Sequence, residues 1–319
     1  MRKALFIGIN EYENVSSLSG CNNDAIAMAS VLQRHASGTP NFSNKVLISA
    51  EDCVTGESMT ENIKALFSGE GEVALLYFAG HGQFDTSIDE GVIIPQDYAV
   101  PKDGIRISDI LEWANAASKI HHKIIILDCC QSGAAGEDRT LKGGCSVLGE
   151  GVTILTACKK EEFAVEYGGH GIFTNLMLQA LHGGAANVLG QITPGNLYSF
   201  VDNALGSWAQ RPIFKTNVSR FTALRETAPL VPLDILRQLP VWFPEQESEF
   251  LLDPSFEPTE SAYDKSNGEV FAKLQKCNRH SLVEPINEEH MYYAAINSTG
   301  CRLTALGAYY WELAKKEHI

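Results

Sequence analysis

The chain has 319 residues, of which 45% are hydrophobic and 20% charged, which suits one large domain or a medium domain with a small module. Its formal net charge of −14 argues against a protein that binds duplex nucleic acid through a basic face. The eight cysteines are irregularly spaced and form no CxxC pair, which argues against a disulfide framework and a structural zinc site.

Short apolar runs alternate with amphipathic segments up to about residue 226. The first run, 4–9, is too short for a signal peptide or a membrane span, so we expect a cytoplasmic protein without membrane contact. Further strands are expected at 45–49, 72–80, 91–95, 123–128 and 151–158, and helices at 21–35, 58–68 (with Thr60 as N-cap), 108–118 and 171–184. This alternation predicts an α/β fold, with a doubly wound, mostly parallel sheet and helices on both faces. In such sheets the chemistry gathers beyond the carboxyl ends of the strands.

Residues 227–262 break this pattern. They hold six of the twelve prolines and seven acidic residues against one basic residue, which predicts an extended acidic connector after a domain at 1–226. Residues 263–319 predict a small helical or winged-helix-like module. Seven basic and seven acidic residues make this module neutral, so it lacks the charge of a nucleic-acid-binding winged helix. We expect a sensor or docking element for an activating protein partner; the alternative is a helical cap packed on the first domain.

Two predicted strands end in residues that carry chemistry. The run LLYFAG leads into His81 and Gly82, and IIILD leads into Cys129 and Cys130. A thiol must lose its proton to attack a carbonyl carbon, and an imidazole at the end of a neighbouring strand can accept that proton. A structural histidine and an inert cysteine are the alternatives. His170 is a second candidate base, ranked lower because it precedes a helix and does not follow a strand.

The stretches YFAGHG and LDCCQSG resemble the caspase-like cysteine peptidases, in the metacaspase and bacterial orthocaspase branch. ALFIGINEY, LSGCNNDA, IIPQDY and GIFTNLMLQAL fit the same family in the same order, over roughly residues 1–225. The family motif D-x-C-x-S-G falls on 128–133, so the resemblance implies Cys130 as nucleophile and His81 as base, with Cys129 on the opposite side of the strand. It also implies a Cys–His dyad, a thioester intermediate, and the backbone amides of Gly82 and Cys130 as oxyanion donors.

The resemblance further implies an S1 pocket lined by Asp128 and by Asp24 of GCNNDA. Two carboxylates in one pocket call for a basic P1 side chain, and a guanidinium suits them best. Alternatively, Asp24 is a first-turn acid favoured by the helix dipole and Asp128 is a strand-end cap. The chain departs from the family at Ala79, where the family has a pocket serine, and at Gln131, where histidine is usual, so selectivity is open in its details.

Two loops carry further expectations. Many metacaspases need calcium, and the loop after the histidine strand here holds four acids: Asp85, Asp89, Glu90 and Asp97. Four acids in a short solvated loop are usually no more than that, so we expect no cofactor and keep a calcium site as the alternative. The polar, glycine-rich segment after Cys130 offers Arg139 and Lys142, where the resemblance implies limited autoprocessing.

The sequence therefore predicts a cysteine endopeptidase that cleaves protein or peptide substrates after Arg or Lys. A clan relative with a non-basic P1 preference, such as a separase-like peptidase, is one alternative, and the two pocket acids argue against it. A scaffold or sensor acting through its C-terminal module is another, and the intact dyad argues against it. Bacterial caspase-like peptidases with short appended modules resemble inducible effectors of antiviral defence or cell death; that role rests on association alone.

Overall fold

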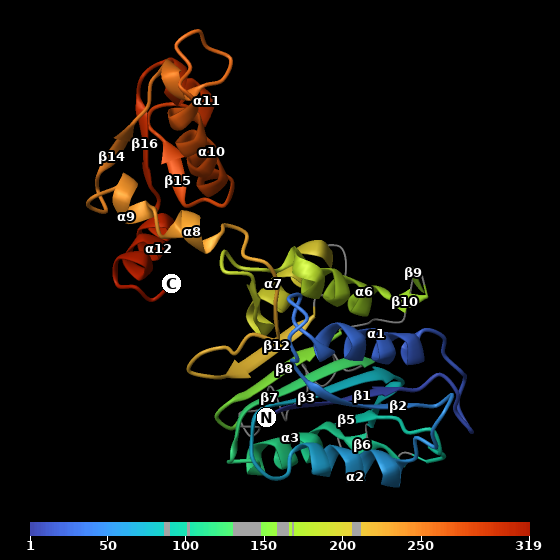
Figure 1. Cartoon of the computed structure of the whole chain (residues 1–319). Helices are drawn as coiled ribbons and strands as arrows, with labels where there is room; N and C mark the ends of the chain where they lie inside the picture. The colour runs from blue at the N-terminus through green and yellow to red at the C-terminus, as the bar shows by residue number, and fades with distance from the viewer. Residues whose placement is uncertain (86–89, 101–102, 130–147, 158–165, 168, 206–211) are drawn as a thin grey trace. The chain divides into compact units, whose positions relative to one another are not determined.

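The computed structural model describes residues 1–85, 90–100, 103–129, 148–157, 166–167, 169–205 and 212–319 (Figure 1). Contacts within the chain divide it into two compact units. Unit 1 comprises Met1–Ala186 and Gln191–Thr227, and unit 2 comprises Asn187–Gly190 and Ala228–Ile319.

Unit 1 is built on a six-stranded sheet with the order β12-β8-β7-β3-β1-β2. Its strands are β1 (Arg2–Gly8), β2 (Ser43–Ile48), β3 (Gly71–Gly80), β7 (Ile120–Cys129), β8 (Val152–Thr156) and β12 (Ile213–Asn217). All neighbours pair in parallel except β12, which runs antiparallel to β8. This arrangement confirms the predicted mostly parallel α/β sheet.

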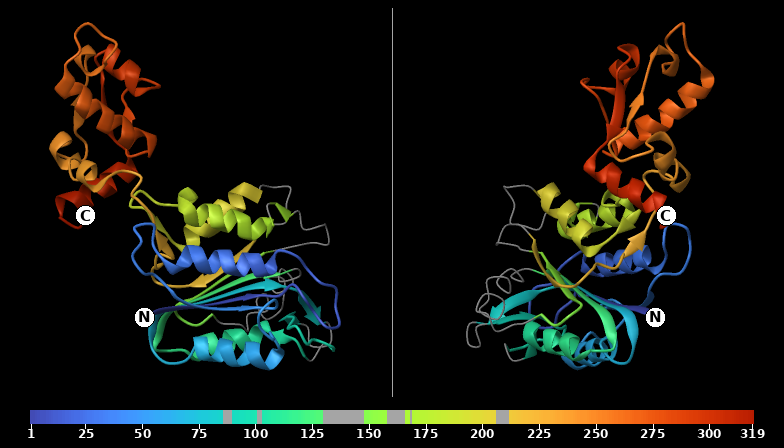
Figure 2. Two further views of the ribbon diagram at one scale, coloured as in Figure 1. Left: turned by 45° about the vertical axis from the view of Figure 1, so that its right-hand side comes forward. Right: turned by 90° about the vertical axis from the view of Figure 1, so that its left-hand side faces the viewer.

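Helices cover both faces of this sheet (Figures 1 and 2). One face carries α1 (Cys21–Gln33), α6 (Ile172–Gln179) and α7 (Pro194–Leu205), and the other carries α2 (Gly56–Leu66) and α3 (Ile107–Ala116). Successive strand residues therefore enter opposite hydrophobic clusters, which explains why the strands are apolar without interruption. The predicted N-cap of α2 is wrong: Thr55, not Thr60, caps it by accepting a hydrogen bond from the Ser58 amide at 3.2 Å.

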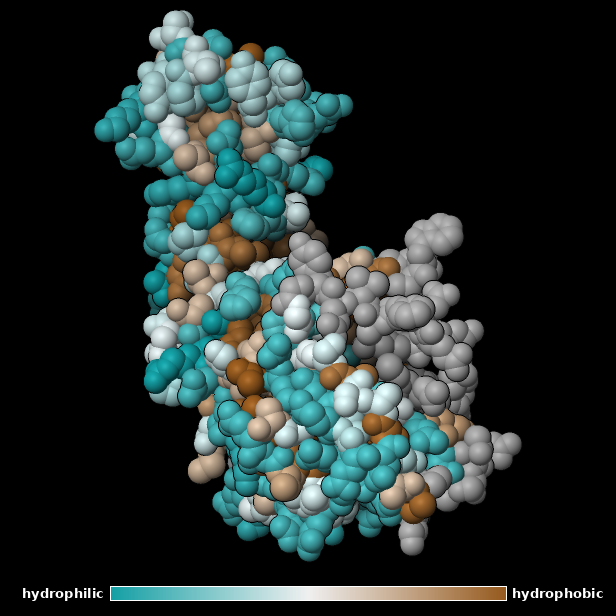
Figure 3. Space-filling model, turned by 90° about the vertical axis from the view of Figure 1, so that its right-hand side faces the viewer, coloured by the Kyte–Doolittle hydropathy of each residue, from teal (hydrophilic) through white to brown (hydrophobic). Residues whose placement is uncertain are grey.

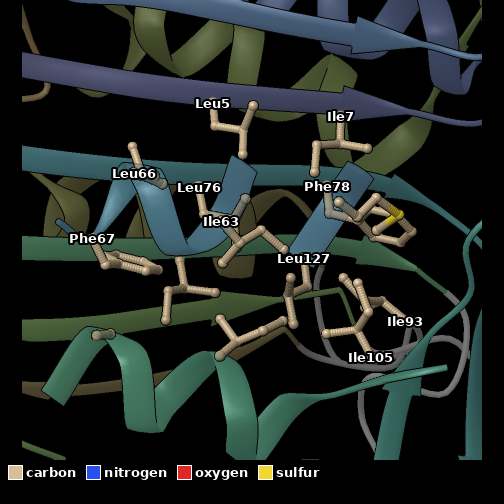
Figure 4. Packing of buried hydrophobic residues seen from close by; sticks show 14 of the residues in the cluster. Leu5, Ile7, Ile63, Leu66, Phe67, Leu76, Phe78, Ile93, Ile105 and Leu127 are labelled. Atoms are coloured by element: carbon tan, nitrogen blue, oxygen red, sulfur yellow. The ribbon is translucent and has the colours of Figure 1, made fainter. Parts of the chain in front are cut away.

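The cluster on the α2 face shows how the strands are held (Figure 4). Leu76 and Phe78 of β3 pack with Leu127 of β7 and with Ile63 of α2, and all four are fully buried. Burying a side chain of this size contributes about 1.5 to 3 kcal/mol. The packing fixes the register of β3 against β7, and this register sets which residues meet at their carboxyl ends.

Three small sheets complete unit 1. β4 (Gly82–Asp85), β5 (Glu90–Ile93) and β6 (Ile105–Arg106) form an antiparallel sheet after the end of β3. β9 (Glu166–Tyr167) pairs with β10 (His170–Gly171), directly before α6, and β11 (Gln191–Ile192) pairs with β13 (Arg225–Glu226). The helix predicted over 171–184 is α6 followed by a π-helical turn, η2 (Ala180–Gly184), which closes at Gly183 with a φ of 127° that favours glycine.

Unit 2 contains a three-stranded antiparallel sheet of order β14-β16-β15 and several helices. Its elements are α8 (Leu233–Leu236), α9 (Leu239–Trp242), β14 (Glu249–Leu251), η3 (Pro254–Phe256), α10 (Lys265–Arg279), β15 (Val283–Pro285), α11 (Met291–Ile296), β16 (Gly300–Leu303) and α12 (Ala305–Lys315).

The segment expected to be an extended connector, 227–262, folds differently. Its apolar residues enter the same hydrophobic core as the residues after 263. Phe243 is fully buried there, and its carbonyl oxygen accepts a hydrogen bond from Trp311 Nε1 at 2.6 Å. Most acidic residues of the segment are exposed, with Glu257 buried as an exception, and the apolar residues between them bind the segment into unit 2.

Among the described residues that Figure 3 draws in colour, most are hydrophilic, with hydrophobic residues between them. Scattered apolar side chains of this kind are normal on protein surfaces. Within the described parts of the chain, none of the helices has both the length and the apolar character needed to cross a bilayer.

Candidate functional site

The carboxyl ends of β3 and β7 lie side by side in unit 1. Ala79 pairs with Asp128, and Gly80 pairs with Cys129, at the last positions of the two strands. His81 follows β3 directly. The register therefore brings the predicted base and the predicted pocket acid to one edge of the sheet, where parallel α/β sheets carry their sites.

Tyr12 and Ser16, in the segment between β1 and α1, hold His81 in place. The His81 amide donates to Tyr12 Oη at 2.8 Å, and the two rings pack with centroids 4.9 Å apart. The imidazole Nε2 lies 2.8 Å from the carbonyl oxygen of Ser16. Because a carbonyl oxygen only accepts, Nε2 carries the hydrogen, and Nδ1 is the ring nitrogen that is left to take up a proton.

Close packing explains the glycine before this histidine. A Cβ atom at Gly80 would lie 2.6 Å from Tyr12 Oη and 2.8 Å from Phe78 Cζ. Such distances are too short for any side chain. Gly80 therefore allows Tyr12 to approach the backbone and hold His81.

The predicted nucleophile Cys130 lies outside the described residues, as do Gln131, Arg139 and Lys142. Its neighbour Cys129 is described: the side chain is buried and packs in the cluster on the α2 and α3 face. Asp128 precedes it on β7 and faces α6. The strand alternation that separates Cys129 from the pocket side is thus present. Gly82 opens β4, where it pairs with Ile93, and its role as an oxyanion donor stays a prediction.

The two predicted pocket acids come together. Asp24 lies in the first turn of α1 and Asp128 near the end of β7, and both are buried, with 3% and 5% exposure. A Cβ atom placed on Gly171 would lie 3.4 Å from Asp24 Oδ2 and 3.4 Å from Asp128 Oδ2. The two carboxylate oxygens therefore lie no further apart than twice that distance. Ala79, in place of the family serine, is the strand neighbour of Asp128 and is 1% exposed.

A buried chain of hydroxyls holds Asp128. Thr174 Oγ1, in α6, donates to Asp128 Oδ2 at 2.7 Å. Tyr77 Oη lies 2.6 Å from the same Thr174 oxygen, and because the threonine hydrogen is used on the carboxylate, Tyr77 is the donor. Burial, followed by the charges of Asp128 and Asp24, holds the pKa of Tyr77 well above its usual value, so its hydroxyl keeps its proton.

Asp24 is held by the residues before α6. His170 Nδ1 lies 2.7 Å from Asp24 Oδ1, and the Gly171 amide donates to Asp24 Oδ2 at 3.2 Å. Burial, and then the nearby charge of Asp128, raises the pKa of Asp24 to about 6, while His170 and the Gly171 amide act in the opposite direction. Asp24 therefore ionises at neutral pH at the cost of its burial beside Asp128.

The acids considered for calcium mostly have structural partners. Glu90 Oε1 accepts from the Ser108 amide at 2.7 Å at the start of α3, and Asp97 Oδ1 accepts from the Gly56 amide at 2.9 Å at the start of α2. Asp85 is buried and pairs with Glu90 across β4 and β5, and Asp89 lies outside the described residues. In the part of the chain that the structure describes, no three His, Cys, Asp or Glu side chains gather in a way that would hold a metal ion. Glu90 and Asp97 therefore each accept a hydrogen bond from an amide at the start of a helix, and a calcium requirement stays untested.

Comparison with known proteins decides the family. Residues 1–221 match the caspase domain of peptidase family C14. The chain belongs to the caspase domain family. The resemblance inferred from the sequence is therefore confirmed, and the matching family is a family of cysteine peptidases.

Two kinds of relatives agree with this family. Metacaspase-2 of Trypanosoma brucei brucei is 27% identical over 201 residues, covering 51% of this chain and 56% of that protein. Metacaspase-3 of Trypanosoma cruzi (strain CL Brener) is 27% identical over 147 residues, covering 41% of this chain and 40% of that protein. The chain spans about half the length of these curated relatives.

Solved structures share the caspase fold of unit 1. Caspase-1 from Spodoptera frugiperda aligns with a TM-score of 0.52 at 15% identity, over 71% of this chain and 90% of that chain. A protein from Geobacter sulfurreducens aligns with a TM-score of 0.51 at 17% identity, over 72% of this chain and 98% of that chain. At these identities the likeness concerns the fold alone.

Sequence reasoning missed several residues of the caspase-domain site. His170 was considered only as a second base, although its Nδ1 is used on Asp24. Thr174 and Tyr77 give no signal in the sequence, because a buried hydroxyl relay forms only when α6 packs on the sheet. The Ser16 carbonyl that holds His81 is a backbone group, which any residue type supplies.

Proposed function

We propose that this chain is a cysteine endopeptidase that cleaves protein substrates after Arg, and less readily after Lys, with Cys130 as nucleophile and His81 as proton carrier. The convergence of two buried carboxylates, Asp24 and Asp128, beside the strand end that leads into His81 carries the proposal. An arginine side chain has five N–H donors in a planar fork, so one guanidinium can bind both carboxylates. Lysine offers three donors on a single nitrogen and fits less well, and an aspartate at P1 would meet two like charges.

In the proposed reaction, the Cys130 sulfur attacks the scissile carbonyl carbon while the thiol proton passes to His81 Nδ1. The Ser16 carbonyl supports this assignment, because it holds Nε2–H. The C–N bond breaks as the imidazole gives that proton to the leaving amine, and a thioester remains. Water, deprotonated by the same imidazole, then hydrolyses the thioester, and the thiol regains its proton.

Two backbone amides complete the proposed reaction. We assign those of Gly82 and Cys130 to the negative charge that develops on the carbonyl oxygen. Thiol and imidazole chemistry runs without a metal or an organic cofactor, so the proposal includes none.

We also propose how the peptidase is activated and where it acts. Arg139 and Lys142 carry side chains that suit the same pocket, so we propose limited autoprocessing at one of them. Unit 2 is the proposed docking element for an activating protein partner, supported by its exposed aromatic side chains, Tyr263, Tyr292, Tyr293 and Tyr309. We propose a bacterial defence or cell-death effector that works in a cytoplasm, where thiols stay reduced, without nucleic-acid or membrane partners.

A peptidyl-arginine acyloxymethyl ketone tests the nucleophile and the pocket together, because it alkylates the thiol of a peptidase that accepts Arg at P1. Mass spectrometry should locate the adduct on Cys130. Cys129→Ala should be labelled like the wild type, since Cys129 is buried on the other face of the sheet. Cys130→Ala should not be labelled. An adduct on Cys129, or equal labelling by the matched aspartyl ketone, would contradict the proposal.

A further inference from the structure

The carboxylate of Asp24 is held on both oxygens by one short segment that comes from a distant part of the chain. His170 Nδ1 lies 2.7 Å from Oδ1, and the Gly171 amide donates to Oδ2 at 3.2 Å. Both residues form β10, immediately before α6. The side chain of Asp24 therefore has a fixed orientation only while this segment lies against the first turn of α1.

The surroundings of Asp24 disfavour its charge. Its charge is 3% exposed and faces Asp128 across the point where a Gly171 Cβ would lie. Burial and that second charge both raise the pKa of Asp24, whereas His170 and the Gly171 amide lower it. Tyr77, the other described side chain that these two charges act on strongly, gives its hydrogen to Thr174 and not to Asp24.

The His170 side chain is 27% exposed while Asp24 is 4% exposed, so the buried carboxylate is bonded to a partly exposed ring. The next residue, Gly171, has φ −61° and ψ 143°, a backbone conformation that any residue adopts. A side chain there would stand between the two carboxylates, because its Cβ would already touch both. The segment thus supplies one hydrogen-bond donor from a side chain and one from the backbone, and its glycine places no Cβ beside the two carboxylates.

We propose that His170 is a specificity-determining positioning residue of the S1 pocket, which orients Asp24 so that its carboxylate meets a charged P1 side chain. This inference rests on the proposed cleavage after Arg. It assigns His170 a role through Asp24 and leaves the base role to His81, which follows β3 directly at the edge that β3 shares with β7. Loss of the ring donor removes a hydrogen bond to a charged group, which corresponds to a factor of about ten or more in binding.

The test compares two matched peptides, one with Arg and one with citrulline at P1, which has nearly the same shape without the charge. The readout is the Arg-to-citrulline ratio of kcat/KM. His170→Ala should lower this ratio about tenfold, through KM and with kcat little changed. His170→Asn should restore most of it, because the Asn amide nitrogen reaches the position of Nδ1. His182→Asn, at an exposed histidine after α6, is the matched control and should leave the ratio unchanged.

A double variant separates positioning from a general structural effect. Because His170 acts through Asp24, Asp24→Asn with His170→Ala should have the same ratio as Asp24→Asn alone. An unchanged ratio in His170→Ala, an equal loss on both peptides without rescue by Asn, or an added loss in the double variant would overturn the inference. If the wild type cleaves after Arg and a variant gives one of these outcomes, the role of His170 is overturned and the proposed function is kept. A wild type that does not cleave after Arg overturns the function and this role with it.

Discussion

Replacing Asp24 by Asn should stabilise the protein at neutral pH, although it removes one of the two carboxylates of the proposed S1 pocket. Burial and the charge of Asp128 raise the pKa of Asp24 from 3.8 to about 6 in the folded state. A tenfold change in an ionisation constant corresponds to about 1.4 kcal/mol, so ionising Asp24 in the folded protein costs about 3 kcal/mol more than in the unfolded chain.

The number of protons bound in each state decides how the free energy of unfolding changes with pH. Between pH 3.8 and about 6 the folded state keeps a proton on Asp24 that the unfolded chain has released. The free energy of unfolding therefore falls as pH rises through this window, and the full cost is present above about pH 6. Asn cannot ionise, so the stability of Asp24→Asn relative to the wild type should rise by about 3 kcal/mol between pH 4 and pH 8. The lost acceptor for the Gly171 amide lowers the whole curve by about 1 kcal/mol.

Urea titrations from pH 4 to pH 8 measure this difference, with hydrogen exchange of the β3 and β7 amides assigning the transition to unit 1. Glu57→Gln is the matched control, because Glu57 is also a first-turn acid of a unit 1 helix but is exposed. Its difference from the wild type should stay flat over the same range. Two results would refute this reasoning: a stability difference between Asp24→Asn and the wild type that does not change with pH, or a wild type that becomes more stable relative to the variant as pH rises. Either would show that the hydrogen bond to His170 outweighs the effect of burial.

Three further predictions concern the pocket and unit 2. Thr174→Val removes the donor to Asp128, so the free energy of unfolding should fall by about 2 kcal/mol and kcat/KM for Arg peptides by about tenfold. Thr153→Val is the control: it loses a neutral contact to Thr216 and should leave the P1 preference unchanged in the same assays. Gly171→Ala should keep its thermal stability yet lose at least about tenfold in kcat/KM for Arg, because its Cβ occupies the space between the carboxylates; full activity would place the P1 side chain elsewhere. Deleting 228–319 should leave small-peptide cleavage largely intact and change activation, and a folded but inactive deletion would count against a docking role.

Much of unit 1 was predictable because its strands are buried on both faces. Runs such as LLYF in β3 and IIIL in β7 have no polar interruption, which is typical of a covered parallel sheet. Parallel strands end at a common edge, so their pattern indicates that His81 and the residues after Asp128 reach the same edge of the sheet, and the pairing of β3 with β7 makes them neighbours. The meeting of Asp24 with Asp128 came from the family resemblance and not from periodicity, because α1 and β7 are far apart in the chain.

The parts that sequence reasoning missed depend on tertiary contacts. His170 and Thr174 act on the two acids only because α6 and β10 pack beside α1, and no local pattern encodes that. The connector expected over 227–262 was inferred from prolines and acids, which describe the surface of that segment. The apolar residues of the same segment pack inward, as Phe243 does, which is fully buried in the core of unit 2.

The P1 preference tests the central claim most directly. The measurement is kcat/KM on fluorogenic peptides that differ only at P1, with Arg, Lys, Leu or Asp, for the wild type and for Asp128→Ala. The two buried carboxylates predict Arg above Lys, both at least about a hundredfold above Leu and Asp, and a higher KM for Arg in Asp128→Ala. A wild type that prefers Asp or Leu at P1 would contradict the account.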